Sequence, residues 1–508
     1  MRNRLLMPTL GCVLAVMAGA SCNKFLDPNP TDVLTTENFY KSATDAVSAV
    51  NGAYAQMPYT YLYFFYLGDI AGDDIMADAG FGSDGHQLAD YTFDKTLWTV
   101  DYVWSNAYIT INRCNIVLDR VPAIQMDTTL KLRVLGEAQF IRALSYFTLV
   151  SLFGDVPLVT KEVTNAKLGV VARTPKAQVY TQIEADLQTA AKNLPASYGG
   201  SDAGRATSGA ALSLLGKVYL YQQDWTNAAN YLGQVINSGT YQLNAKYYDN
   251  FRVATQNTNP ENVFSVDYGS PETVTGYIGQ IALLFGLPSG FPGGDAYSLE
   301  LVLPSAVNSF SATDSRGRGA SFITSPDTVR STYLANGKGD SIITWNSPPG
   351  AALHKPVDEQ DHQNMTARSW EQQPNYQPII RYSDVLLMYA EAVANGGTQT
   401  AGPAGAALDK VRIRGDSMAT PAAGLSGAAF MDTLRIERKR EFMYEGIRWF
   451  DLSRWGILDQ TLRAKQAEIL TIFPGEFSAV HGVPSNIYPI PQTEINSDPL
   501  LTQNPGWN

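Results

Sequence analysis

Apolar residues recur at intervals of three and four along much of the chain, and residues 136–159 show this pattern most clearly. The spacing predicts a helix that begins near Leu130 and ends at Gly154. Additional apolar residues widen the apolar face until little of the helix can face water, which is typical of a buried helix. Gly154 suits the left-handed position after a helix, and Pro157 prevents the helix from resuming. We therefore expect other helices to pack around this one.

The same periodicity predicts further helices on both sides of this segment. They cover residues 37–57, 98–121, 174–194 (with Thr174 as N-cap), 205–238 (two helices joined by a turn at Asp224), 379–395, 404–414 and 427–446. Within residues 205–238, Ala211, Gly216 and Ala228 allow two helices to approach closely, and this arrangement resembles a tetratricopeptide unit. Arrays of this kind normally need at least three stacked pairs. The chain is therefore predicted to be mainly α, with tetratricopeptide-like helix pairs forming a scaffold.

Two regions lack helical periodicity. Residues 68–94 are acidic and rich in glycine, and are predicted to form a loop. Residues 244–371 are rich in Gly, Pro, Ser, Asn and Thr, which predicts a large irregular insertion with short strands, such as residues 262–268 and 341–345. Function concentrates in long loops of this kind. We expect one domain over residues 37–508, with its scaffold in 37–243 and 379–508 and a loop-rich ligand or partner region in 244–378.

The N-terminus has the features of an export signal. Arg2 and Arg4 precede an apolar stretch over residues 5–18, and small residues lead to Cys22. This order resembles a lipoprotein signal, although Gly19 stands where such signals have Leu. It predicts a signal peptide over 1–21, fatty acylation of Cys22 and a Pro-rich tether over 22–36; more than one acyl chain suffices for stable membrane attachment. The alternative is an ordinary signal peptide followed by an incidental cysteine.

Composition narrows the class of function. The net charge of −11 argues against a nucleic-acid partner, which would require a basic face. Of the three cysteines only Cys114 lies in the body of the chain, where a buried thiol is expected rather than a disulfide. The four histidines form no metal-binding spacing, and no nucleophile elbow or phosphate loop occurs, so we expect no catalysis. A glycosidase needs only two facing carboxylates, however, so the sequence leaves that alternative open.

Six segments together resemble one family, the SusD/RagB outer-membrane lipoproteins of Bacteroidota. In chain order they are CNKFLDPNP (22–30), WSNAYITINRCN (104–115), residues 136–159, RYSDVLLMYAEA (381–392), RKREFMYEGIRWFDLSRWG (438–456) and YPIPQTEINSDPLLTQNPGW (488–507). The resemblance implies a helical scaffold, an oligosaccharide-binding face on irregular loops, and a partnership with a SusC-like TonB-dependent transporter. It also implies a lipid-anchored protein of the outer membrane that is exposed at the cell surface. Two alternatives remain, a tetratricopeptide-type scaffold that binds only protein and a secreted glycoside hydrolase.

Sugar binding requires aromatic rings that stack on C–H faces and planar polar groups that meet hydroxyls. Loop position, and not the resemblance, selects the candidates. They are Trp98, Tyr277, Phe285, Trp345, Trp370, and the carboxylates of Asp73 and Asp74. Asp73, Asp74, Asp78 and Asp84 could also hold Ca²⁺, but they lack the alternation of an EF-hand loop, so a solvated acidic loop is favoured and no cofactor is expected.

Residues 435–448 combine arginine, glutamate and aromatic residues. A cationic helix of this kind could bind an anion, but the nearby glutamates favour a partly buried network of ion pairs. We therefore expect this segment to hold the scaffold together. The expected members of the network are Arg435, Glu437, Arg438, Arg440, Glu441, Glu445 and Arg448.

Overall fold

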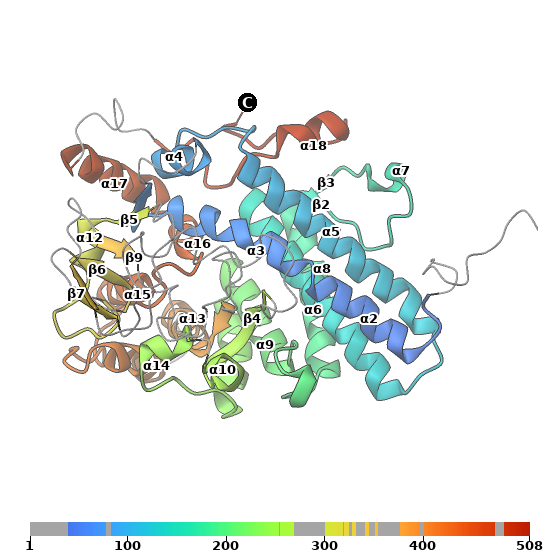
Figure 1. The fold of residues 1–508 in the computed structure, drawn as a ribbon, viewed down its shortest axis with the longest axis horizontal. Coiled ribbons are helices and arrows are strands. Elements are labelled where there is room, and N and C mark those ends of the chain that lie inside the picture. Colours follow the sequence, from blue (N-terminus) through green and yellow to red (C-terminus); the bar gives the residue numbers. More distant parts are fainter. Residues whose placement is uncertain are drawn as a thin grey trace, which may run out of the picture.

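A computed structural model describes most of the chain and confirms a mainly helical architecture (Figure 1). The described residues are 39–77, 83–252, 254–268, 300–317, 320–324, 328–331, 341–344, 351–353, 376–396, 401–472 and 482–507. The helices among them are α2 (Ala43–Tyr54), α3 (Met57–Phe65), α4 (Ser83–Asp90), α5 (Trp98–Arg120), α6 (Thr128–Phe153), α7 (Ala166–Gly169), α8 (Lys176–Asn193), α9 (Ser208–Tyr221), α10 (Trp225–Asn237), α12 (Pro304–Val307), α13 (Tyr382–Gly396), α14 (Ala401–Gly415), α15 (Gly427–Glu441), α16 (Arg448–Arg454), α17 (Leu458–Ile472) and α18 (Gln492–Ser497).

Helix α6 is the central helix that the apolar pattern predicts. The Asp127 side chain caps its start by accepting the N–H of Leu130 at 2.8 Å. The helix ends where Gly154 adopts a φ of +72°, a conformation that glycine reaches without strain. Nearly every residue from Gly136 onward is buried, and α2, α5 and α8 pack against the helix. Its role as the organiser of the core is therefore confirmed.

Successive helices then stack as pairs. Helices α8, α9, α10, α13 and α14 each contact the next one in this order. Thr207 and Asp224 cap α9 and α10, as the turn at Asp224 predicts. At Gly216, a methyl group would lie 2.8 Å from a Leu232 methyl carbon, so a larger residue would have to displace the Leu232 side chain between α9 and α10. The small residues thus position the second helix as the tetratricopeptide-like pattern requires.

Short strands lie beside this helical array, mostly in the region predicted to be loop-rich. A four-stranded sheet has the order β1 (Ile75–Ala77), β5 (Glu300–Val302), β9 (Ala351–Leu353), β6 (Phe322–Thr324). Three two-stranded pairs join β4 (Asn262–Val266) to β10 (Gln377–Arg381), β2 (Val156–Pro157) to β3 (Arg173–Thr174), and β7 (Thr328–Ser331) to β8 (Ser341–Thr344). β4 and β8 match the two predicted strands.

Several predicted boundaries are wrong for identifiable reasons. Helix α2 starts at Ala43 rather than residue 37, because Ser42 and Asp45 form a reciprocal capping box. Helix α8 starts after Pro175, and Thr174 lies in β3 instead of capping the helix. Residues 379–381 belong to β10, and the predicted helix 427–446 stops at Glu441. Beyond that point Tyr444 and Gly446 adopt positive φ values, which end the helix.

The acidic segment 68–94 is also more ordered than a loop. It contains the end of a π-helix over Tyr66–Ile70, strand β1 and helix α4. Strand β1 pairs antiparallel with β5, so this segment connects the N-terminal scaffold to the loop-rich region. Gly68 lies against Gly446, whose N–H donates to the Asp69 carboxylate at 2.6 Å. The segment therefore packs against the C-terminal half of the chain.

The C-terminal residues fold back onto the first half of the scaffold. The Tyr488 N–H donates to the Leu152 carbonyl at 2.8 Å, and the Asn504 amide donates to the Phe153 carbonyl at 2.9 Å. The Trp507 ring stacks on Phe93 with centroids 5.0 Å apart. The tail is extended, as predicted, except where α18 interrupts it.

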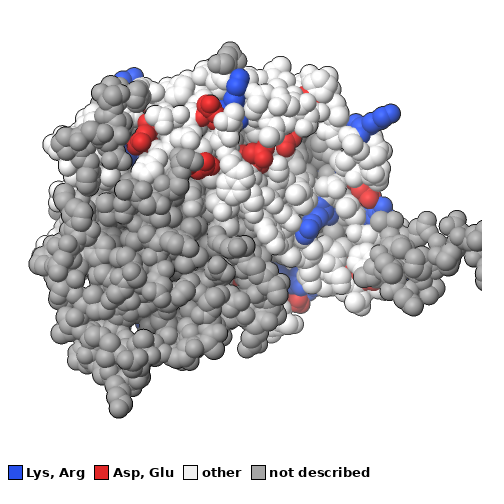
Figure 2. Space-filling view, turned by 45° about the horizontal axis from the view of Figure 1, so that its top comes forward, with Lys and Arg blue, Asp and Glu red and all other residues white. Residues whose placement is uncertain are grey.

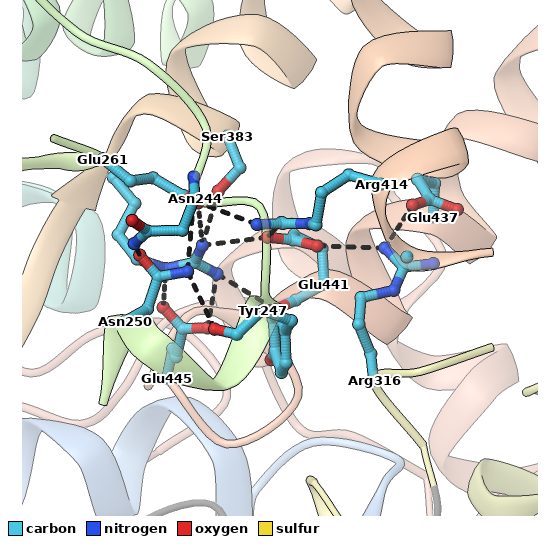
Figure 3. Close-up of polar contacts among 12 residues, drawn as sticks. Asn244, Tyr247, Asn250, Glu261, Arg316, Ser383, Arg414, Glu437, Glu441 and Glu445 are labelled. Carbon is cyan, nitrogen blue, oxygen red and sulfur yellow. Dashed lines mark hydrogen bonds and ion pairs between the residues drawn. The ribbon is translucent and has the colours of Figure 1, made fainter. Parts of the chain in front are cut away.

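Three of the predicted residues, Glu437, Glu441 and Glu445, belong to a buried ion-pair network whose other members come from distant segments (Figure 3). Three of the predicted arginines pair elsewhere: Arg438 binds Asp384 and Asp451, Arg448 binds Asp73, and the more exposed Arg435 lies 3.4 Å from Asp432. Arg381 contacts Glu261 at 2.5 Å, Glu441 at 2.8 Å and Glu445 at 2.7 Å. Arg414 also binds Glu261 and Glu441, and Arg316 binds Asp314, Glu437 and Glu441. Because Glu261 and Arg316 lie in the loop-rich region, the network fastens that region to the C-terminal scaffold.

The carboxylates of this network have different proton affinities. Burial raises the pKa of Glu437, and its partner Arg316 offsets this only in part. At Glu441 burial acts in the same direction, but Arg414, Arg381 and Arg316 outweigh it and lower the pKa below the usual range. Neighbouring cations also lower the pKa of Asp384, a second buried carboxylate. Burial would raise this pKa, yet Lys217 and Arg438 lower it to about 2.

Candidate functional site

Four aromatic side chains form a partly exposed surface where α3 lies against α5. We call Tyr59, Tyr63, Trp98 and Tyr102 the Trp98 cluster. Trp98 is the first residue of α5 and is 49% exposed, and Tyr59 is 38% exposed. Most large aromatic residues of the helices are buried, as Trp104 and Tyr146 are. The Trp98 cluster therefore differs from the aromatic residues that fill helix seams.

Helix geometry places these four rings together. Tyr59 and Tyr63 are four residues apart on α3, and Trp98 and Tyr102 are four residues apart on α5, so each pair lies on one helix face. The Tyr63 ring meets Trp98 edge-on, with centroids 4.9 Å apart, and meets Tyr102 at 4.8 Å. Trp98 and Tyr102 lie 5.0 Å apart at 47°. These mutual contacts hold the rings of Tyr63, Trp98 and Tyr102 in place without a ligand.

Polar groups border the rings. The Gln56 amide donates to the Asn106 side chain at 2.8 Å, and the Asn106 amide donates to the Tyr102 carbonyl at 2.8 Å. Asp84 accepts the Thr99 N–H at the start of α5. Burial raises the pKa of Tyr63, and the Asp84 charge adds to this effect; burial likewise raises the pKa of Tyr102. Both phenols therefore keep their protons at neutral pH and remain able to donate hydrogen bonds.

Sequence reasoning selected Trp98 and missed its three tyrosine neighbours. The signal was present in the two aromatic pairs at a spacing of four residues, 59/63 and 98/102. Periodicity alone could not distinguish them from seam residues, because buried and exposed aromatic pairs share the same spacing. Only the crossing of α3 and α5 brings the two pairs together.

The prediction that Asp73 and Asp74 lie on a solvated loop is wrong. Asp73 is 8% exposed and contacts Arg448 at 2.5 Å and Lys439 at 2.9 Å. Asp74 is 1% exposed and contacts Lys439 at 2.9 Å. Burial would raise the pKa of Asp73, but Arg448 and Lys439 lower it far below its usual range. These carboxylates bind cations of the C-terminal scaffold rather than solvent, and they do not line the Trp98 cluster.

The remaining predicted positions lie outside the described residues. These are Cys22, Tyr277, Phe285, Trp345 and Trp370, together with Asp78 of the acidic segment. Cys114 is described and is fully buried on α5, where burial raises the pKa of its thiol. A structural role for this cysteine is therefore confirmed.

In the described part of the chain, no group of three or more His, Cys, Asp or Glu side chains is arranged to hold a metal ion. Asp84 lies on α4 and accepts the Thr99 N–H of α5, whereas Asp73 and Asp74 pair with Lys439. None of the described helices combines the length and the apolar character needed to cross a membrane. On the face shown in Figure 2, acidic and basic side chains are interspersed on a mostly uncharged described surface.

Two family models match the chain. Residues 24–220 match a model described as "Starch-binding associating with outer membrane", and residues 291–507 match the model of the SusD family. A SusD-like protein of Formosa agariphila is 26% identical over 537 residues, which cover 98% of each chain. A SusD-like protein of Bacteroides ovatus is 24% identical, over 87% of this chain and 81% of that protein.

Solved structures agree with these matches. A structure described as a laminarin-binding SusD-like protein has 27% sequence identity and a TM-score of 0.72, and the match covers 92% of this chain and all of that one. A SusD superfamily protein from Bacteroides vulgatus gives the same TM-score and coverage at 23% identity, which supports the fold alone. With both halves of the chain matched in order and the helical fold shared, this chain belongs to the SusD/RagB family.

Proposed function

We propose that this protein binds an oligosaccharide at the cell surface and passes it, uncleaved, to a SusC-like TonB-dependent transporter in the outer membrane. The observation that carries the proposal is the exposed Trp98 cluster, because aromatic rings that are fixed in place can stack on the C–H faces of sugars. Phenol hydroxyls supply polar groups at the same surface, and the half-buried Asn106 lies one turn after Tyr102, held by the buried Gln56. The laminarin-binding relative and the starch-binding family description support a carbohydrate as the ligand.

The proposal also assigns roles to the N-terminal cysteine, the loop-rich region and the ion-pair network. Cys22 would carry the lipid, which agrees with the outer-membrane association in the family description. The predicted platform residues Tyr277, Phe285, Trp345 and Trp370 remain proposed contacts of the ligand. The network around Arg381 would hold the loop-rich region beside the scaffold while the ligand is bound.

Replacing Trp98 with alanine is expected to weaken glycan binding at least about fivefold, because one aromatic stacking partner contributes about 1–3 kcal/mol and about 1.4 kcal/mol is a factor of ten. Binding is measured by calorimetry with a panel that includes laminarin and soluble starch. Trp98→Phe should retain most of the affinity, and Met418→Ala, at a side chain that is 75% exposed, should retain all of it. Unchanged affinity in Trp98→Ala would reject the cluster as the platform. Glycan cleavage that a single carboxylate-to-amide change abolishes would favour the hydrolase, and binding to no glycan would favour the protein-binding scaffold.

Replacing Cys22 with alanine is expected to move the protein from the membrane fraction to the aqueous fraction. The acyl chains contribute about 0.8 kcal/mol per buried methylene group, and no described helix replaces them. Fractionation of cells that express either form, followed by detergent phase partition, makes the comparison. Equal membrane partition of the unsubstituted protein and Cys22→Ala would contradict lipidation. It would not contradict the proposed glycan site.

A further inference from the structure

An apolar groove of about 600 Å³ runs along the outer face of α5. Its floor includes Tyr108, Ile109 and Ile116 of α5. The segment from Pro157 to Gly169 forms one wall, and residues 494–501 after the start of α18 form another. In the view of Figure 1, α7 and α18 both lie above α5. The groove is separate from the Trp98 cluster, which lies at the start of α5.

The walls of the groove are fixed rather than loosely placed. Asn115 donates to the carbonyls of Val159 and Lys161, and the Val163 N–H donates to Asn112 at 2.8 Å. On the other side, Ser105 donates to Glu494 at 3.2 Å. The groove is therefore a built feature of the fold.

Exposed apolar side chains occur in the groove and next to its lining residues in the sequence. Ile109 of the floor is 45% exposed, and Leu168, Val170 and Leu500, which adjoin the lining residues Gly169 and Leu501, are 51%, 39% and 51% exposed. Exposed apolar residues that concentrate in this way indicate a surface that another chain segment covers. Isolated exposed apolar residues elsewhere need no such explanation.

The start of the described chain lies at one end of the groove. Tyr40 packs under the guanidinium of Arg120 at the last residue of α5, 5.3 Å from the ring centroid. Arg120 in turn binds Glu162 of the groove wall at 2.7 Å. The residues that precede Phe39 therefore join the body beside the groove.

The lengths match. From Arg120 back to Ile109, α5 rises about 17 Å at 1.5 Å per residue. An extended chain covers this distance in about five residues at 3.3 Å each, which brings Val33 and Leu34 to the level of Ile109. These two are the only large aliphatic residues between Asp27 and Phe39, so the apolar pair coincides with the exposed Ile109.

We propose that the α5 groove is the docking site for residues 31–38 of the same chain, with Val33 and Leu34 covering Ile109. For a protein anchored at Cys22, docking shortens the free tether from residues 22–38 to residues 22–30, or from about 56 Å to about 30 Å. It also turns the face formed by α5 and α18 toward the anchor. This consequence rests on the proposed lipidation, whereas the docking itself does not.

The test uses the chain from residue 23 to the C-terminus with the double substitution Val33→Cys and Ile109→Cys. We expect an intramolecular disulfide under mild oxidation, detected by mass spectrometry of the monomer, with the buried Cys114 left reduced. The matched control pairs Val33→Cys with Ile436→Cys, an isoleucine on α15 that is 46% exposed, and should form none. Failure of the chain with Val33→Cys and Ile109→Cys to form a disulfide would overturn the proposal. Formation of this disulfide only between two molecules would also overturn it, and would assign the groove to a second copy of the chain.

Hydrogen exchange supplies an independent readout without cysteines. The amides of residues 31–38 should exchange at least tenfold faster in Ile109→Glu than in the unsubstituted chain, because the acidic side chain repels Asp32 and disrupts the apolar contact. Ile436→Glu should leave these rates unchanged. Equal rates in the unsubstituted chain and Ile109→Glu would overturn the docking, and membrane partition of Cys22→Ala separately reports on the anchor.

Discussion

Replacing Arg381 with alanine is expected to destabilise the protein by about 3–5 kcal/mol, the cost of breaking a buried ion-pair network by removing one partner. Arg381 is 2% exposed, and its guanidinium contacts Glu261, Glu441 and Glu445. Without it, these buried carboxylates lose their shared partner. The midpoint of urea unfolding, followed by circular dichroism, measures the change.

A matched arginine separates this effect from the loss of any arginine side chain. Arg435 lies on α15, its side chain is 31% exposed, and it pairs only weakly with Asp432 at 3.4 Å. Arg435→Ala should cost less than about 1 kcal/mol, as exposed pairs do. Similar unfolding midpoints for Arg381→Ala and Arg435→Ala would show that the network does not stabilise the fold.

Replacing Gly68 with alanine is expected to have an effect of comparable size, for a steric reason. A methyl group at this position would lie 2.7 Å from the Gly446 Cα and would overlap its carbonyl group. Backbone cannot move aside as a flexible side chain can, so the π-helix or the turn at Gly446 must shift. Overpacking typically costs about 1–3 kcal/mol, and a backbone clash lies at or above the upper end of this range.

Gly52→Ala is the control for this substitution. Gly52 lies in α2, and no atom comes within 4 Å of an added methyl group. That change should stabilise the protein by up to about 1 kcal/mol, since alanine favours helix over glycine. Because Tyr63 precedes the π-helix by one turn, Gly68→Ala should also reduce glycan affinity, whereas Gly52→Ala should not. Wild-type stability in Gly68→Ala would contradict the close approach of the two glycines.

The sequence predicted the parts of the fold that depend on local patterns. The course of α6 follows from apolar spacing and from Gly154, and the pair α9–α10 follows from its small residues and caps. The acidic residues of segment 68–94 suggest a solvent-exposed loop, and this prediction is wrong. Asp73 and Asp74 are instead buried by Lys439 and Arg448, more than 350 residues away, and no local pattern reveals such partners.

The candidate site is also predictable only in part from local sequence patterns. Trp98 could be selected because an aromatic residue after a polar segment is a plausible platform. Tyr63 and Tyr102 could not, because their exposure depends on how α3 crosses α5. The network around Arg381 was predicted from residues 435–448, yet Glu261 and Arg316 could not be named, since ion pairs across long separations carry no sequence periodicity.

The return of the C-terminal residues to α6 bears on how the chain folds. Tyr488, Asn504 and Trp507 bind residues 93–153, which are synthesised hundreds of residues earlier. Contacts of such long range slow folding, because the intervening chain must be ordered before they form. The N-terminal helices must therefore remain competent to assemble until the last residues arrive, and a chain cut short near its end would leave the central helix uncovered.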